Sequence, residues 1–424
     1  MTGLAYHSGG ITGIQRVQLG VAEQLLRDRR WCDVTFCYFE GRVGYRAIRR
    51  AAVAEIVKTI GSAAVSWHAR NRSKIAAVRR LERSLAKRVG RGAPFARGDV
   101  LLNLGFSTYR ERYRDLAGEI LAARGVRYVG MIYDLLMVTH PEWWEPEIID
   151  LHRAWFSFTG RISDPILCCS AATQRDFEWF LASAQLPPRR IHTIRLADGL
   201  SLFAPSPSHE VRPPPRSPYV LYVSQFDVRK NHRLLVDVWQ RLVAEYGAER
   251  VPELLCVGRA GFGGAALVRE LEAAADGLIR VRQEVSDQEL ARLYRDCLFT
   301  VYPSFAEGWG LPIGESLGHG KYCVASSTSS LPEVGGVLVD YHDPTDVARA
   351  ADLIARAAFD ADFRAAREAE IRRKYRIRTW QDALAEIVRA VWEPTPPEEP
   401  GQPGRTLPTG PGSPDPPADG PRLD

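Results

Sequence analysis

Apolar runs and amphipathic patterns alternate along the second half of the chain. Residues 219–224, YVLYVS, predict a buried strand, and apolar positions from Leu234 to Val243 then recur at helical spacing until Gly247. Ser286 and Glu289 have the spacing of a capping box at the start of a later helix. Further strand candidates are LLCVG, LIRVRQEV, LFTVYPS and KYCVAS. Such alternation is typical of a parallel, doubly wound α/β sheet.

The first half of the chain has a similar pattern, which predicts a second α/β domain. Its strand candidates are DVTFCYF, DVLLNLG, RYVGMIYD and PILCCS, with helical patterns between them. A Pro-rich stretch at 205–218 separates the two halves, and we expect the domain boundary there. Open α/β sheets bind ligands at the carboxyl ends of their strands, so we expect a ligand site between the domains.

The expected organisation therefore has five parts. They are an N-terminal Rossmann-like domain (1–204) with a basic insertion (42–98), a linker (205–218), a C-terminal Rossmann-like domain (219–377), an apolar helix (378–392) that crosses back to the N-terminal domain, and a tail (393–424). The tail holds 11 of the 28 prolines, a composition that predicts disorder.

The composition is that of a soluble globular protein. Hydrophobic residues make up 45% and charged residues 25% of 424 positions. The most apolar stretch, 126–138, is far shorter than the roughly 20 residues of a membrane-spanning helix. The sequence begins MTGL, without a basic start or an apolar run, so we expect no signal peptide and a cytoplasmic protein.

The cysteines predict reduced core thiols. The chain has seven cysteines and no C-x-x-C pair. Cys168 and Cys169 are adjacent in a predicted strand, where neighbouring side chains point to opposite faces. We therefore expect neither a redox pair nor a metal site.

Charge is unevenly distributed. The net charge is +5, but residues 42–97 hold 15 Lys and Arg against two Glu, so the rest of the chain carries −8. Within this segment, apolar positions from Ile75 to Val89 have helical spacing, with basic residues on the other faces. Such a helix either binds an anionic surface, such as a membrane, or covers its own domain with its charges in water. The sequence leaves both open.

The most specific chemical signal is the stretch PSFAEGWGLPIGESLGHGKYCVAS. A strand is expected to end at Tyr302, and a Gly-rich loop then leads into a helix near Pro312. Gly308 and Gly310 would let the backbone approach a ligand, and the helix N-terminus offers free amides to anionic oxygens. Glu307 lies in the loop, and Glu315, eight positions later, could bind a vicinal diol. The alternative is a plain strand-turn-helix with two solvent-facing carboxylates.

A second Gly-rich loop lies near the N-terminus, in HSGGITGIQRVQLGV. Thr12 is the expected N-cap of the helix that follows. Amides of Gly9, Gly10 and Gly13 could meet a donor phosphate or an acceptor from the other domain. Only residues 1–7 precede the loop, which is little for a complete first strand.

These motifs together resemble family 4 of the retaining GT-B glycosyltransferases. The resemblance includes YVLYVSQFDVRKNH, VSDQELARLY, SSLPEVGG, TGIQRV and IYDLLMVTHPEWW, in the order typical of the family, over most of residues 11–392. It implies a GT-B fold, in which two Rossmann-like domains face one another. A C-terminal helix returns to the N-terminal domain.

The resemblance also implies roles for particular residues. Glu307 would lie beside the donor sugar and Glu315 would bind the nucleotide ribose, with the amides near Gly310 and Leu311 facing sugar and phosphates. Lys230 matches the family's diphosphate-binding lysine, but Gln225 stands where relatives carry an arginine, and Arg229 is the expected substitute. Two cations there suit a leaving diphosphate, whose charge grows as the glycosidic bond breaks. A solvated helix start is the alternative.

The end of the strand RYVGMIYD faces the reacting sugar in similar proteins. Asp134, the last residue of this strand, could orient an acceptor hydroxyl, or it could only cap a turn. His140, Trp143 and Trp144 follow, and packing between the domains is their expected use.

The resemblance implies a retaining hexosyltransferase that uses a nucleotide-sugar as substrate, with no cofactor and no metal. Similarity to enzymes of bacterial polysaccharide and lipopolysaccharide assembly suggests mannosyl transfer to a lipid-linked glycan. The partners would be the donor, this acceptor and, through residues 42–98, the inner face of the cytoplasmic membrane, with no nucleic acid. Two alternatives stay open: a nucleotide-sugar epimerase of the same fold, and a nucleic-acid-binding protein that uses the basic segment.

Overall fold

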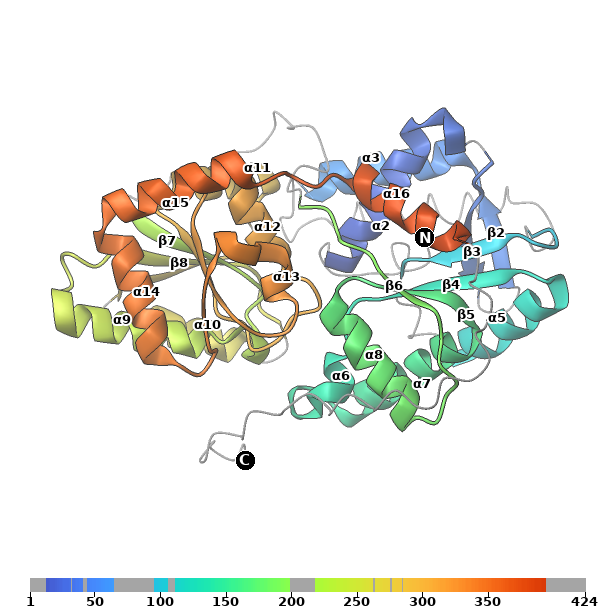
Figure 1. Ribbon diagram of the computed structural model, residues 1–424, viewed down its shortest axis with the longest axis horizontal. Helices are drawn as coiled ribbons and strands as arrows, with labels where there is room; N and C mark the ends of the chain where they lie inside the picture. Colours follow the sequence, from blue (N-terminus) through green and yellow to red (C-terminus); the bar gives the residue numbers. More distant parts are fainter. Residues whose placement is uncertain are drawn as a thin grey trace.

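A computed structural model describes residues 13–31, 33–40, 44–64, 95–105, 111–198, 218–261, 264–274, 277–283 and 285–393. Two parallel sheets, one on each side of the undescribed segment 199–217, organise these residues (Figure 1). Residues 1–7, Gly9, Gly10 and Thr12, the basic helix at 75–89, the linker up to residue 217 and the tail from 394 lie outside the described residues.

The C-terminal half contains a parallel sheet of six strands in the order β12-β11-β10-β7-β8-β9. The strand and helix predictions for this half are confirmed, including the strand end at Tyr302 and the helix end before Gly247. Ser286 accepts a hydrogen bond from the Glu289 amide, as the capping motif predicts. The strands are β7 Tyr219–Val223, β8 Glu253–Val257, β9 Ile279–Arg282, β10 Thr300–Tyr302, β11 Cys323–Ser326 and β12 Asp340–His342.

Helices cover both faces of this sheet. Helix α9 packs against α14, and α11 covers the opposite face, where Leu290, Leu293 and Tyr294 contact β7 and β8. The helical segments are η3 Val228–Lys230, α9 His232–Tyr246, α10 Gly264–Ala273, α11 Asp287–Asp296, α12 Leu311–Gly318, α13 Leu331–Gly335, η5 Gly336–Leu338, α14 Val347–Phe359 and α15 Ala361–Lys374.

The N-terminal half contains a parallel sheet in the order β3-β4-β5-β6. Helices α5, α7 and α8 lie on one face, and α2 and α3 lie on the other (Figure 1). The elements are α2 Gly13–Arg27, η1 Arg29–Trp31, α3 Arg50–Ala64, β3 Val100–Asn103, α5 Glu111–Arg124, β4 Arg127–Ile132, α6 Leu136–Thr139, η2 Pro141–Trp143, α7 Pro146–Ile162, β5 Ser163–Cys168, α8 Ala171–Ser183 and β6 Ile191–Thr193.

The strand predicted at DVTFCYF lies outside this parallel sheet, contrary to expectation. Its residues form β1 (Phe36–Glu40), which pairs antiparallel with β2 (Gly44–Ile48) in a separate two-stranded sheet. Only residues 41–43 separate the two strands, too few for the helical crossover that a parallel pair needs.

Part of the predicted basic insertion belongs to the core of the N-terminal half. Val53 and Val57 of α3 are buried in the same cluster as residues of α2. The Arg50 guanidinium donates to the carbonyl oxygens of Trp31 and Leu25, at 2.8 and 2.5 Å. These contacts tie the start of the basic segment to the domain, so Arg50 serves local structure.

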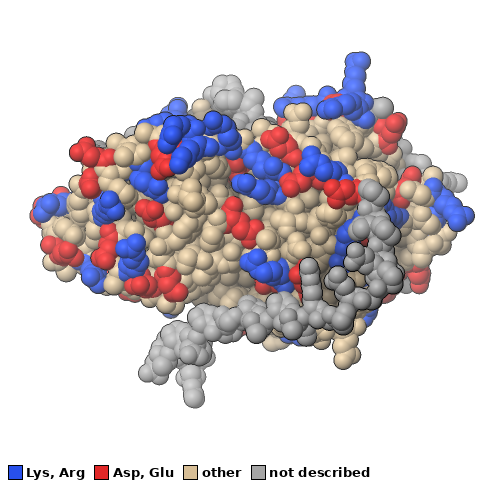
Figure 2. Space-filling view, viewed as in Figure 1, with Lys and Arg blue, Asp and Glu red and all other residues tan. Residues whose placement is uncertain are grey.

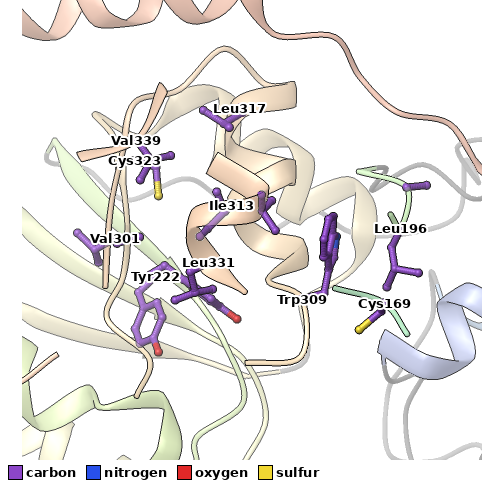
Figure 3. Packing of buried hydrophobic residues seen from close by; sticks show 14 of the residues in the cluster. Cys169, Leu196, Tyr222, Val301, Trp309, Ile313, Leu317, Cys323, Leu331 and Val339 are labelled. Carbon is purple, nitrogen blue, oxygen red and sulfur yellow. The ribbon is translucent and has the colours of Figure 1, made fainter. Parts of the chain in front are cut away.

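One hydrophobic cluster extends across both halves of the molecule. It contains Val17 and Leu19 of α2, Ile313 and Leu317 of α12, and core residues of both sheets. Figure 3 shows Trp309 beside Leu196 and Cys169 of the N-terminal half. Cys168 lies in the other cluster, on the opposite face of β5, which confirms the predicted orientation of the two buried thiols.

Asp198, the last described residue of the N-terminal half, is hydrogen-bonded to Arg378, which lies between α15 and the next helix. The Asp198 amide donates to the Arg378 carbonyl at 3.0 Å, and the Arg378 amide donates to Asp198 Oδ2 at 2.9 Å. Helix α16 (Trp380–Trp392) follows, capped by Thr379, and packs against α2 and β5. The predicted return of the C-terminal helix to the N-terminal half is confirmed (Figure 1).

Charges of both signs are interspersed over the face drawn in Figure 2. Basic side chains gather over α15, but several are paired: Arg367 with Asp340, Arg372 with Glu368 and Lys374 with Glu370. Among the described residues, no helix combines the length and the apolar character that crossing a membrane requires.

The contact between α2 and α16 gives a first prediction. A Cβ added at Gly20 would lie 2.3 Å from the Trp380 ring, so Gly20→Ala should destabilise the protein by about 1–3 kcal/mol through overpacking. Gly118→Ala in α5 is the matched control, because its Cβ would meet Phe158 at an ordinary 3.8 Å and alanine favours helix by about 1 kcal/mol. Urea unfolding should show opposite signs for the two variants; equal shifts would contradict the close packing at Gly20.

Candidate active site

The loop between β10 and α12 carries the Gly-rich motif. Gly310 is the N-cap of α12 and has φ +118°, a conformation that favours glycine, while Pro312 lies in the first helical turn. A Cβ on Gly308 would lie 1.9 Å from the Tyr133 carbonyl oxygen of the N-terminal half. Glycine at 308 is therefore required by contact between the two halves, whatever ligand the loop also approaches.

Glu307 is the centre of a buried charged cluster. Its Oε1 accepts hydrogen bonds from Lys230 Nζ and, at 2.9 Å, from the Tyr302 hydroxyl, while its Oε2 lies 3.1 Å from Arg229 Nη1. The exposed fractions of Glu307 and Lys230 are only 8% and 6%. The alternative for this loop, with solvent-facing carboxylates, is therefore wrong. The alternative for Arg229 and Lys230, a solvated helix start, is also wrong.

The cluster sets the protonation of its members. Burial would raise the pKa of Glu307, but the charges of Lys230 and Arg229 outweigh it and lower this pKa to about 2. Burial, together with repulsion from Arg229, lowers the pKa of Lys230 to about 8. All three groups are thus mostly charged at neutral pH, and Asp227, whose Oδ2 is 3.7 Å from Arg229 Nε, places a second carboxylate beside the two cations.

Local structure explains why both cations face Glu307. Arg229 and Lys230 lie in η3, whose N-cap, Asp227, accepts from the Arg229 amide. Asn231 follows in the left-handed region, with φ 54°, and its side-chain amide donates to the carbonyls of Pro303 and Pro344. Gln225, at the position where relatives carry an arginine, is exposed.

Asp134 belongs to the same site but comes from the N-terminal half. It follows β4, and a Cβ on Gly308 would lie 3.1 Å from the Asp134 Cβ. Its Oδ1 accepts from the Leu136 amide at 3.2 Å, so it does cap a turn. Burial raises the pKa of Asp134, and the charge of Arg229 opposes this increase. Asp134 therefore caps the turn and also faces the cationic cluster.

A second carboxylate links the two halves. Glu333 of α13 accepts hydrogen bonds from the amides of Ala171 and Ala172, at 2.7 and 2.8 Å, at the start of α8. A helix N-terminus favours such a negative charge. Beside it, the Gly308 carbonyl accepts from Cys169 Sγ at 3.0 Å. These contacts hold the loop that carries Glu307 against the N-terminal half.

Glu315 lies one turn into α12, away from the Glu307 cluster. It is buried, and its Oε2 accepts from the Tyr294 hydroxyl at 2.9 Å. Burial raises the pKa of Glu315, and the Arg16 charge opposes this increase. A Cβ on Gly13 would contact the Leu311 side chain at 3.5 Å, so the start of α2 lies against the start of α12.

The structure thus brings the predicted residues into two groups. The first group contains Glu307, Lys230, Arg229, Asp134 and Gly308, and the second contains Glu315, Leu311 and Gly13. Gly310 lies between the two glutamates along the chain. Gly10 lies outside the described residues. Trp143 stacks on His140 and approaches Phe305 at 6.3 Å between ring centroids, which confirms packing between the halves.

Sequence reasoning missed three partners of these groups. Tyr302 and Tyr294 donate to the two glutamates, and Glu333 fixes α8. Tyr302 ends the strand before the motif and Tyr294 lies in VSDQELARLY, so the sequence held a signal for both. The part of the chain that the structure describes contains no group of three or more His, Cys, Asp or Glu placed to hold a metal ion.

Comparison with known proteins now identifies the domain. Residues 217–356 match the family described as Glycosyl transferases group 1. The chain carries a group 1 glycosyl transferase domain. This domain contains both glutamates, Lys230 and Arg229.

Curated proteins that are similar to this chain include mannosyltransferases. O-antigen chain mannosyltransferase B of Escherichia coli is 33% identical over 173 residues, which cover 41% of this chain and 45% of the relative. MMP alpha-(1->4)-mannosyltransferase of Mycolicibacterium hassiacum is 26% identical over 266 residues, which cover 60% and 61%. The match to the first of these spans about half of the relative's length.

Solved structures show the fold around the group 1 domain. HepE of Anabaena, in complex with UDP-glucose, aligns with a TM-score of 0.51 and 18% identity over 69% of this chain and 78% of that one. Sucrose-phosphate synthase from Thermosynechococcus elongatus gives the same TM-score and identity over 76% and 79%. These neighbours are GT-B enzymes, and the predicted GT-B fold is confirmed.

The Glu307 cluster of the group 1 domain gives a second prediction. Glu307→Ala leaves two buried cations without their carboxylate, which should reduce the free energy of unfolding by about 3–5 kcal/mol. Because the pKa of Glu307 is lowered from 4.5 to about 2, its stabilising effect is present above pH 4.5 and is lost as the pH falls toward 2. Urea unfolding at pH 7 and pH 3 measures both effects.

The matched control for this prediction is Glu270→Ala, which removes an exposed ion pair with Arg233. It should leave the urea midpoint unchanged. A Glu307→Ala midpoint equal to that of the control would contradict a buried, tightly coupled cluster.

Proposed function

We propose that this protein is a retaining glycosyltransferase that transfers a hexose from a nucleotide-sugar to a glycan acceptor. The observation that carries the proposal is the buried Glu307–Lys230–Arg229 cluster of the group 1 domain, which faces Asp134 of the N-terminal half. It supplies positive charge where a diphosphate would leave, next to a carboxylate where an acceptor would enter.

Lys230 and Arg229 would stabilise the leaving diphosphate. They lie on one short helical segment and share the Glu307 carboxylate, so they are already oriented before a ligand arrives. The amides of Gly310 and Leu311, at the start of α12, would donate hydrogen bonds to sugar or phosphate oxygens and so stabilise further negative charge. With these groups charge stabilisation needs no metal, and activity should therefore persist in EDTA.

The state of Glu307 favours a mechanism without a protein nucleophile. Its carboxylate accepts hydrogen bonds from two cations and a phenol, and its pKa of about 2 makes it a weak base. We infer that the acceptor hydroxyl attacks from the face that the diphosphate leaves, and that the departing phosphate takes the hydroxyl proton. The new bond then has the configuration of the old one, and Asp134 orients the acceptor.

Relatives supply the proposed sugar and acceptor. Several of the curated relatives are named as mannosyltransferases, and one of these names refers to O-antigen chains. We infer a mannose-like sugar and a lipid-linked oligosaccharide or polysaccharide as the acceptor. Enzyme and acceptor would meet at the inner face of the cytoplasmic membrane, with basic residues of the 42–98 segment on the anionic surface.

Nucleotide binding tests the donor part of the proposal. Calorimetry with UDP, GDP and dTDP should show that one of them binds, and Glu315→Ala should weaken that affinity at least tenfold. A charge-assisted hydrogen bond to ribose is worth about 1.5–3 kcal/mol, and about 1.4 kcal/mol is a factor of ten. Glu272→Ala, an exposed position on α10, is the control and should bind as the wild type does. Normal binding by Glu315→Ala would remove Glu315 from the nucleotide site.

Liposome flotation tests the membrane part. The protein should float with anionic vesicles at low salt and be released at 1 M salt, where the Debye length is only about 3 Å. Changing Arg79, Arg80, Arg83 and Arg88 to Glu should abolish flotation. The same number of reversals in α15 and just after it, at Arg364, Arg372, Arg373 and Arg376, is the matched control. If the α15 variant is the one that fails to float, the attachment surface is not the 42–98 segment.

A further inference from the structure

Helix α2 places one arginine at the contact between the two halves. Arg16 lies in the motif TGIQRV, one turn from Gly13, whose Cβ position is 3.5 Å from the Leu311 side chain. Its Nη2 is 3.0 Å from Asp287 Oδ1 at the start of α11, and the side chains are 19% and 21% exposed. The guanidinium is thus held in the C-terminal half although its backbone belongs to the N-terminal half.

Arg16 also faces the proposed ribose-binding carboxylate. Burial would lower the pKa of Arg16, but the charges of Asp287 and Glu315 outweigh it and raise the pKa above its usual value. Tyr294, which donates to Glu315 at 2.9 Å, contributes in the same direction. The guanidinium is therefore close enough to Asp287 of α11 and to Glu315 of α12 to interact with both charges.

The guanidinium is only partly used by the ion pair. Arg16 Nη1 is buried and has no hydrogen-bond partner among the described residues. A buried donor without a partner is destabilising, and it is satisfied when an acceptor oxygen comes within reach.

We propose that Arg16 binds the phosphate next to the ribose of the donor nucleotide, opposite Glu315, and so makes donor binding depend on the position of the N-terminal half. The inference rests on the proposed function, because it needs a nucleotide whose ribose lies at Glu315. Phosphate oxygens match the fork of N–H donors on a guanidinium, and the free Nη1 supplies the first of them. Lys230 and Arg229 then hold the second phosphate of the donor. Both phosphates leave together as part of the nucleoside diphosphate.

The rival interpretation is that Arg16 only pins the halves together through Asp287. The two interpretations differ in what Asp287 does. If the ion pair only joins the halves, removing Arg16 or Asp287 should have the same effect on nucleotide affinity. If Arg16 binds phosphate, Arg16 is needed for that affinity whether or not Asp287 is present. Asp287→Asn keeps the side-chain shape and removes the carboxylate that competes with phosphate for Arg16.

The experiment measures, by calorimetry, the affinity for whichever nucleoside diphosphate the wild type binds and for the matching monophosphate. Arg16→Ala should weaken both by the same factor, at least tenfold, because both contain the phosphate next to the ribose. Arg16→Lys should lose less, and Asp287→Asn should lose nothing. Arg27→Ala is the matched control, since Arg27 lies on the same helix with its side chain 69% exposed, and should bind as the wild type does.

Each result decides the question. The inference would be overturned if Arg16→Ala and Arg16→Lys bound nucleotide with wild-type affinity. It would also be overturned if Arg16→Ala and Asp287→Asn lost the same amount of affinity. Thermal melting shows whether each variant is folded. If the wild type binds nucleotide and Glu315→Ala does not, but Arg16 is dispensable, only the inference fails. If the wild type binds none of the nucleotides, the proposed function fails and the inference with it.

Discussion

A buried carboxylate holding two buried cations is the constraint on which the centre of this protein depends. Neither Lys230 nor Arg229 could be kept out of water at a sheet edge without Glu307, and Glu307 could not stay ionised without them. With Asp227 beside Arg229, the two cations face two carboxylates. The cluster is therefore a stable structural element whose cations are oriented before an anion arrives, which is what phosphate-ester chemistry requires.

The surroundings of the cluster show how a charged site can be assembled from two halves of a chain. The loop of Glu307 reaches Asp134 and Tyr133 because Gly308 has no side chain, and Glu333 adds a carboxylate at the start of α8. Below these polar contacts, Trp309, Leu196 and Cys169 share one hydrophobic cluster. Burial of apolar area thus brings the halves together, and hydrogen bonds set their register.

The proposed mechanism and the inference about Arg16 use the same physical device. In each, a cation is paired with a carboxylate before the ligand arrives. Glu307 keeps Lys230 oriented at little conformational cost, whereas Asp287 competes with phosphate for Arg16. The two devices lie at different positions: Arg229 and Lys230 come from the C-terminal half, while Arg16 comes from α2. A nucleotide held by both would connect the halves, so donor binding and domain position would be linked.

Apart from the short strands β6 and β12, the sequence by itself determined the parallel strands of both halves, helix α16 and the loop with Glu307 and Glu315. Those features follow from local periodicity, turn residues and short motif spacing, which need no knowledge of distant contacts. It did not determine the antiparallel pairing of β1, because a single apolar run does not specify its partner. Nor did it show that Gly308 is required by Tyr133, or that Tyr302, Glu333 and Arg16 complete the site. Those contacts join residues from 5 to 271 positions apart, and only tertiary packing of two separately folded halves brings the longer-range pairs together.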